Sequence, residues 1–103
     1  MSTPGFISTW PHPFHRLVDG KPGPLAEVFQ LRPDLVEELR SWSGGQVVFI
    51  NGGPAVLLPG AAPLTRRLVG LGDFAVRADT GFLAEPAAGF YQRYQPADLV
   101  ATS

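Results

Sequence analysis

The last third of the chain constrains the fold most, because it alternates apolar and polar side chains around a turn. Residues 73–78 and 82–85 read as two strands joined by a tight turn that contains Gly81. Pro86 then opens a short helix, expected over Pro86–Tyr94, whose Phe90 and Tyr94 stand four residues apart over one patch of sheet. Folding accounts for nearly every residue of this stretch, which leaves few side chains for chemistry.

The middle of the chain predicts one main helix among strands. Residues 25–31 alternate as a first strand. The helix is expected over Pro33–Ser43, with proline in its first turn, one apolar stripe and Gly44-Gly45 at its end. The β-branched and aromatic run 46–51 predicts a strand covered on both faces, paired in a hairpin with residues 55–58, and residues 67–69 are read as a further strand.

These elements predict a single α+β domain, which suits a chain of 103 residues. We expect a small, mostly antiparallel sheet of four to five strands packed on the main helix, with a short C-terminal helix at one end. The domain is assigned to residues 25–96, after an arm of residues 1–24 and before a tail of residues 97–103. The expected core residues are Phe29, Leu35, Leu39, Trp42, Val48, Ile50, Phe74, Val76, Phe90 and Tyr94.

The first 24 residues are rich in proline and in aromatic side chains. Proline fixes φ and lacks an N–H donor, so this arm is expected to contain neither a regular helix nor an inner strand. A disordered arm seldom carries so many large apolar side chains. Phe6, Trp10 and Phe14 either fill a groove on the chain's own domain or anchor it in a partner, as interface aromatics do. These three are the predicted partner-binding residues.

Composition disfavours several classes of function. The net charge is −1, which provides no basic field for a phosphate backbone and disfavours nucleic-acid binding. The absence of cysteine removes disulfides and thiol chemistry. No run approaches the ~18 apolar residues that span a bilayer, and no signal-peptide pattern opens the chain. A soluble protein of a cytoplasm is expected.

No constellation of residues predicts an active site. His12 and His15 form an H-x-x-H pair near Asp19, but Pro13 breaks the helix that would aim both rings to one side. Asp34, Glu37 and Glu38 are explained by the helix dipole, and Glu85 by the start of the next helix. We therefore predict no catalytic, cofactor-binding or metal-binding residue and no enzymatic activity.

The order of these motifs resembles a family. Its features are the strand Ala26–Leu31, the helix segment Pro33–Gly45, the run Gly72–Arg77, the pair Gly81-Phe82, and Phe90 with Tyr94. In this order the chain resembles a group of small proteins of unknown function encoded by bacteriophages, especially actinobacterial phages and prophages. The resemblance implies a compact α+β fold and a phage origin, and it brings no catalytic residues. Met1–Pro24 and the loop Pro59–Pro63 depart from the family pattern.

Three functions remain open at this stage. The first is a non-enzymatic phage accessory protein that binds another protein, such as a host factor, in the host cytoplasm. The second is a virion component, such as a head, tail or decoration subunit, docked through residues 1–24. The third is a small metal-binding enzyme with a site near His12 or His15. Self-association into a homo-oligomer is also left open.

Overall fold

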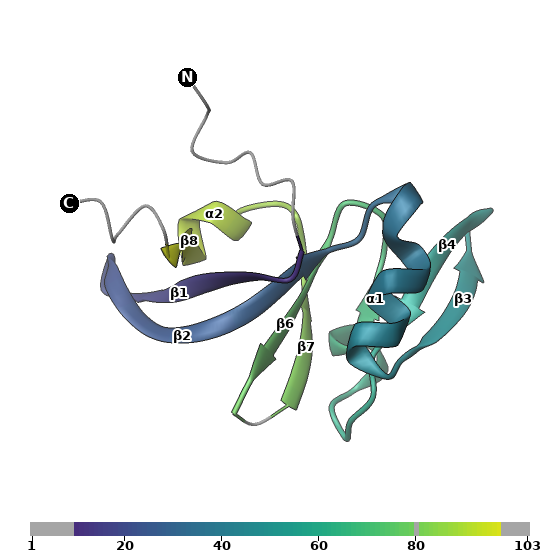
Figure 1. Cartoon of the computed structure of the whole chain (residues 1–103), viewed down its shortest axis with the longest axis horizontal. Coiled ribbons are helices and arrows are strands. Elements are labelled where there is room, and N and C mark those ends of the chain that lie inside the picture. The colour runs from purple at the N-terminus through teal and green to yellow at the C-terminus, as the bar shows by residue number, and fades with distance from the viewer. Residues whose placement is uncertain (1–9, 80, 98–103) are drawn as a thin grey trace.

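The described part of the chain folds into two antiparallel sheets and two short α-helices. The computed structural model describes residues 10–79 and 81–97. A five-stranded sheet has the order β7-β6-β2-β1-β8, and a three-stranded sheet has the order β3-β4-β5 (Figure 1). The strands are β1 (His12–Val18), β2 (Lys21–Gln30), β3 (Gln46–Ile50), β4 (Gly53–Leu57), β5 (Leu68–Val69), β6 (Phe74–Ala78), β7 (Gly81–Glu85) and β8 (Tyr94–Pro96). The α+β class and the antiparallel pairing are confirmed.

The main helix begins later than predicted. Pro33–Leu35 forms a 3₁₀ turn (η1), and the α-helix α1 covers Val36–Ser43. It ends at Gly44, where φ is 72° and the N–H donates to the Arg40 carbonyl oxygen at 2.9 Å, as predicted for a left-handed glycine cap. A second 3₁₀ turn, η2, covers Leu64–Arg66, and the second α-helix, α2, covers Phe90–Arg93.

The prediction of a single sheet is wrong. The segment that carries α1 and the smaller sheet is inserted between β2 and β6, which are neighbours in the larger sheet. Their register pairs Val28 with Val76 and Phe29 with Ala75. The predicted hairpin forms as β3 and β4, but it pairs with β5 and not with the larger sheet. Strand pairing across such an insertion is a long-range choice that no local pattern of residues encodes.

The expectation that the first 24 residues contain no inner strand is also wrong. β1 lies between β2 and β8, and it continues into β2 through the turn Asp19-Gly20, whose φ angles are 54° and 76°. The prolines are tolerated because pairing is incomplete around them. Pro13 lies just beyond the stretch Phe14–Arg16 that pairs with β8, and β6 pairs only with the part of β2 that follows its prolines.

The C-terminal helix is shorter than predicted. Gly89, at φ 73°, precedes α2, and the expected span Pro86–Tyr94 therefore holds a single helical turn. Phe90 and Tyr94 stack with ring centroids 4.7 Å apart, as their spacing predicted. Tyr94, however, begins strand β8, which the sequence reasoning missed and which pairs with β1.

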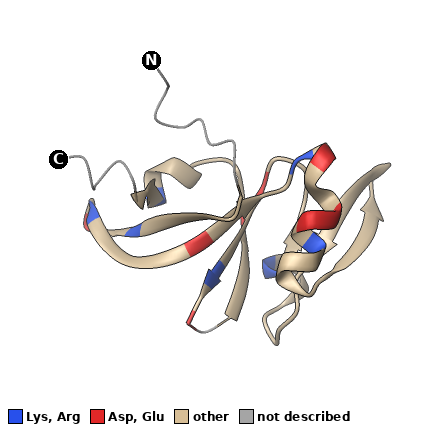
Figure 2. Cartoon of the chain, viewed as in Figure 1, with Lys and Arg blue, Asp and Glu red and all other residues tan. Residues whose placement is uncertain are grey.

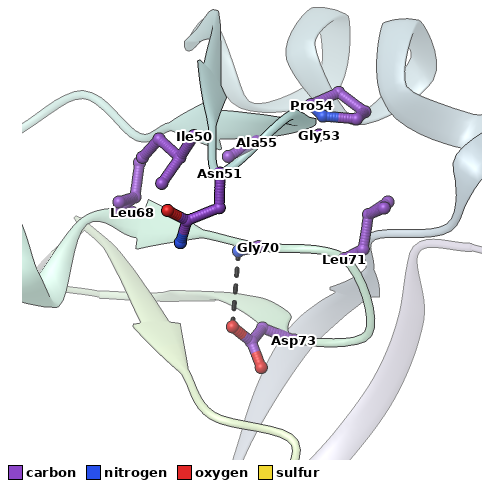
Figure 3. A pocket seen from close by; sticks show the side chains of 9 residues that line it. All are labelled: Ile50, Asn51, Gly53, Pro54, Ala55, Leu68, Gly70, Leu71 and Asp73. Carbon is purple, nitrogen blue, oxygen red and sulfur yellow. Dashed lines mark hydrogen bonds between the residues drawn. The ribbon is translucent and has the colours of Figure 1, made fainter.

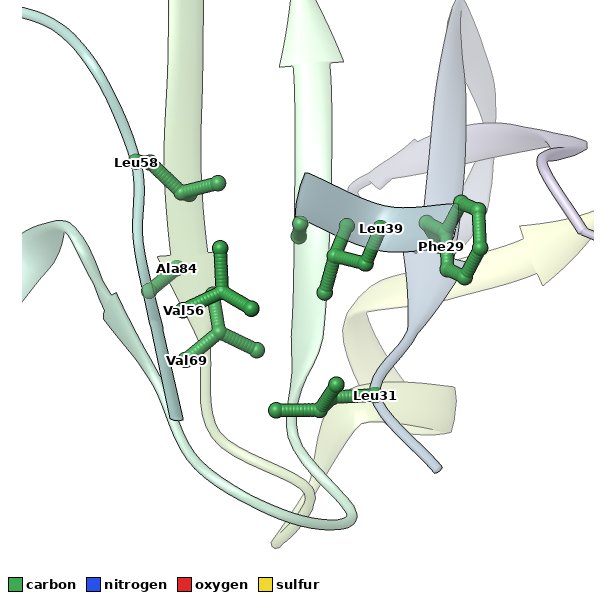
Figure 4. Close-up of a cluster of buried hydrophobic side chains, with 8 residues drawn as sticks. Phe29, Leu31, Leu39, Val56, Leu58, Val69 and Ala84 are labelled. Carbon is green, nitrogen blue, oxygen red and sulfur yellow. The ribbon is translucent and has the colours of Figure 1, made fainter. Parts of the chain in front are cut away.

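Both faces of the larger sheet are buried at its centre. Because side chains alternate along a strand, Phe29 and Val28 point to opposite faces of β2, as Ala75 does relative to Phe74 and Val76 on β6. One face joins α1 and the smaller sheet in a cluster of Phe29, Leu31, Leu39, Val56, Leu58, Val69, Ala75 and Ala84 (Figure 4). The other face joins α2 in a cluster of Phe14, Val28, Phe74, Val76, Phe90 and Tyr94.

Most of the predicted core is confirmed. Leu35 and Trp42 are partly buried and pack against the first cluster. Val48 is only half-buried and Ile50 is 40% exposed, so these two predictions are wrong. The expectation that their strand is covered on both faces fails with them. The predicted residues that are buried are Phe29, Leu39, Phe74, Val76, Phe90 and Tyr94.

Candidate interaction surface

The hairpin of β3 and β4 ends in a two-residue turn that its residues specify. Asn51 and Gly52 have φ angles of 53° and 79°, the conformation of the tight hairpin turn that Asn-Gly favours. The register places Ile50 opposite Gly53, directly before and after this turn. The β-branched and aromatic side chains of Val47 to Ile50 supply the strand preference. Local sequence therefore determines both the turn and the register.

β3 is an edge strand with a free side. Among the described residues it pairs with β4 and with no other strand. In a two-residue hairpin the pair next to the turn is hydrogen-bonded, and such pairs alternate along the strands. Val48 and Ile50 therefore direct their backbone groups toward β4. Val47 and Phe49 direct theirs outward, where a further strand could bind them.

The side chains at the end of β3 are apolar and exposed. Phe49 is 76% exposed, the highest value among the large apolar side chains that the structure describes as exposed. Ile50 is 40% exposed, and Leu71, in the loop after β5, is 46% exposed. We call the free side of β3 together with Phe49, Ile50 and Leu71 the β3 edge surface.

A shallow pocket adjoins this surface. It has a volume of about 360 Å³ and is lined by residues of β3, β4, β5 and the loop that follows β5, among them Ile50, Ala55, Leu68 and Leu71 (Figure 3). Asp73, at its border, already accepts hydrogen bonds from the N–H groups of Gly70 at 3.3 Å and Ala87 at 3.0 Å. The charged group of the pocket therefore joins two loops, and the other lining side chains are apolar except for the Asn51 amide.

The β3 edge surface lies in an uncharged part of the chain. No Asp, Glu, Lys or Arg stands between Arg40 and Arg66, although charged residues make up 17% of the sequence. Figure 2 shows the β3–β4 hairpin without blue or red, whereas charges of both signs mark α1 beside it. Natural edge strands are commonly protected by charges or proline against pairing with other chains, and β3 has neither. The edge is therefore open to strand addition.

Two of the three predicted partner-binding residues pack in the chain's own core. Phe14 is fully buried, and its ring centroid lies 5.4 Å from that of Phe90. Trp10 is half-buried and stacks on Phe14 at 6.3 Å, with the Arg32 guanidinium 5.6 Å from its ring. For these two, the structure favours the alternative in which the aromatics fill a groove on their own domain. Phe6 lies outside the described residues.

Both histidines make contacts within the fold. His15 Nδ1 lies 2.8 Å from the Gly23 carbonyl oxygen, next to a register shift in the β1–β2 pair. His12 is half-buried, with its ring centroid 5.6 Å from that of Phe14. Within residues 10–79 and 81–97, no three His, Cys, Asp or Glu side chains gather as metal ligands would.

Carboxylates on the molecule serve contacts within the fold. Glu37 forms an exposed ion pair with Arg40 on α1, and this hydrogen bond lowers the pKa of Glu37. Glu85, predicted to start a helix, instead accepts hydrogen bonds from Arg93 Nη2 at 3.1 Å and Tyr94 Oη at 3.2 Å. Burial, followed by the nearby Glu85 carboxylate, raises the pKa of Tyr94. The first bond links β7 to α2 and the second links β7 to β8. Because β7 and β8 are the two edge strands of the larger sheet, this sheet must curl.

Sequence reasoning missed the β3 edge surface because it read the strand as covered. The signals were present in the sequence, as a long uncharged stretch around a short β-branched strand. Whether such a strand lies inside a sheet or at its edge depends on the partners that it meets in the fold.

Comparison of the chain with protein-family models, with curated proteins and with solved structures finds no match. None of the helices in the described ranges is long and apolar enough to cross a membrane.

Proposed function

We propose that this chain is a non-enzymatic protein that acts by binding another protein through the β3 edge surface. The observation that carries the proposal is Phe49, a large aromatic side chain that is 76% exposed on an uncharged edge strand. Apolar side chains grouped with unpaired backbone groups are typical of surfaces that add a strand from a partner.

The surface offers a partner two kinds of contact. The outward N–H and C=O groups of Val47 and Phe49 provide main-chain hydrogen bonds, which give affinity with little dependence on the partner's side chains. The pocket beside Ile50 offers a partner a further contact. The partner is therefore an extended, proline-free segment.

The resemblance to phage-encoded proteins extends this proposal to a biological setting. We propose a phage accessory protein whose target is a host protein in the host cytoplasm. The alternative, a virion subunit docked through residues 1–24, is less well supported because Phe14 and Trp10 pack on the chain's own sheet.

The test compares three purified proteins as baits: the parent chain, Phe49→Lys and Leu64→Lys. Leu64 is the matched control because it is also a large exposed apolar residue, at 58%, but lies outside the β3 edge surface. We expect a protein from cells of the natural source to bind the parent and Leu64→Lys, to bind Phe49→Lys at least ~tenfold more weakly, and to keep this order when purified. Equal binding by all three baits would refute the assignment of the surface.

A further inference from the structure

We propose that the strand that pairs with β3 comes from a second copy of this chain, in a symmetric dimer of two antiparallel β3 strands. This inference rests on the proposed function, because it takes the β3 edge surface as the binding surface. It differs in naming a second copy, in place of a host protein, as the chain that occupies this surface. It would join two three-stranded sheets into one continuous sheet across a twofold axis.

The backbone of β3 is complementary to itself in one register. β3 runs from Gln46 to Ile50, so pairing all its residues with an antiparallel copy requires the twofold axis to pass at Val48. Val47 then lies opposite Phe49 of the second copy. These are the residues whose backbone groups point outward, so each such pair can exchange both of its hydrogen bonds. An axis at Val48 therefore pairs the whole strand and also brings the outward backbone groups of Val47 and Phe49 into hydrogen-bonded pairs.

β3 lacks the charged residues by which natural edge strands avoid pairing with other chains. A twofold axis brings each side chain near its own copy, so any charge close to the axis meets a like charge. β3 carries none, and the nearest charged residues along the chain are Arg40 and Arg66. The other edges of the two sheets are less suited: β5 has two residues, β8 contains Pro96 and β7 carries the charged Glu85.

The side chains fit on both faces of the joined sheet. On one face Phe49 would cover the half-buried Val47 of the second copy, and on the other the two Val48 side chains would meet at the axis. Phe49 is 76% exposed, so its two copies would together bury on the order of 300 Å², about a quarter of the ~1,200 Å² at the low end of specific interfaces. We therefore expect a weak, reversible dimer that forms only at high concentration.

Sedimentation velocity tests the dimer by comparing variants that carry opposite charges at position 49, alone and mixed. The parent chain and the control Leu64→Lys should shift from monomer to dimer as concentration rises toward about 1 mM, the weak end of ordinary affinities. Phe49→Lys and Phe49→Glu should each lose at least ~tenfold in association, because each brings like charges together near the axis. An equimolar mixture of the two variants should regain the dimer. A monomeric parent chain, or a dimer that Phe49→Lys leaves intact, overturns the inference.

A second measurement reads the register directly. The chain has no cysteine, so a single introduced thiol reports on its own surroundings. In Val48→Cys the two introduced thiols would face each other at the axis, within the Cα separation that a disulfide needs. Under mild oxidation Val48→Cys should therefore form a covalent dimer at least ~tenfold faster than Leu64→Cys. Equal rates overturn the inference, provided that circular dichroism shows both variants folded.

The two proposals fail in different ways. If the parent chain stays monomeric but a different protein binds it and is lost with Phe49→Lys, the dimer is wrong and the proposed function stands. If neither a copy nor another protein binds at Phe49, both are wrong.

Discussion

Replacing Phe14 with alanine tests whether residues 12–24 belong to the folded core or to a separate arm. Phe14 is fully buried, and its ring contacts those of Phe90 at 5.4 Å, His12 at 5.6 Å and Tyr91 at 6.1 Å. It sits on an inner strand, so the cavity left by truncation cannot close by moving a loop. Truncating a buried phenylalanine costs about 3–5 kcal/mol, transfer and cavity terms together. That is a large share of the ~5–15 kcal/mol by which domains are stable.

Urea denaturation followed by far-ultraviolet circular dichroism measures this loss. Tryptophan fluorescence is less suitable because Trp10 stacks on Phe14 and would respond to the substitution directly. Leu25→Ala is the control. Leu25 is 62% exposed, so this change should lower the free energy of unfolding by no more than ~0.5 kcal/mol. A loss below about 1 kcal/mol for Phe14→Ala would refute the packing of β1, because a contact that is merely peripheral costs that little.

Two further perturbations test other parts of the fold. Gly44→Ala should lower the free energy of unfolding by about 1–2 kcal/mol in the same assay, because a Cβ is strained at φ 72° although nothing lies within 4 Å of it. Gly44→Asn should lower the free energy of unfolding less, because asparagine adopts this conformation more readily. Equal losses for the two variants would contradict the left-handed cap. Tyr94 has a raised pKa in the folded state, so its contribution to stability is complete below the ordinary tyrosine value of ~10 and is lost as pH rises above it. Tyr94→Phe should therefore show a shallower loss of stability between pH ~9 and ~11, measured by urea titration at each pH, and an unchanged slope would show that the Tyr94 hydroxyl does not titrate differently on folding.

The elements of the fold were predictable where a local rule governs them. Gly44 ends α1 because a left-handed residue is required there, and Asn51-Gly52 turns β3 into β4 for a similar reason. The spacing of Phe90 and Tyr94 predicted their contact even though only one turn of helix joins them. Each of these predictions depends on residues within a few positions of one another.

The candidate surface was not predictable in the same way. Val48 and Ile50 have the composition of a buried strand, and their exposure follows from the strand order, in which β3 has a neighbour on one side only. Trp10 and Phe14 are residue types that often anchor interfaces, yet the larger sheet and α2 enclose Phe14. The same residue types can lie in a core or on a surface, and the arrangement of strands decides between them.

By itself, the sequence determined the Asn51-Gly52 turn, the cap of the main helix, the antiparallel α+β class and the lack of charge between Arg40 and Arg66. The tertiary structure decided that β2 pairs with β6 across an inserted sheet, that β1 is an inner strand in spite of its proline, and that β3 has a free edge. The physical reason is range. Backbone conformation and side-chain alternation are set by adjacent residues, whereas strand neighbours and burial are set by which distant segments best cover one another's apolar faces.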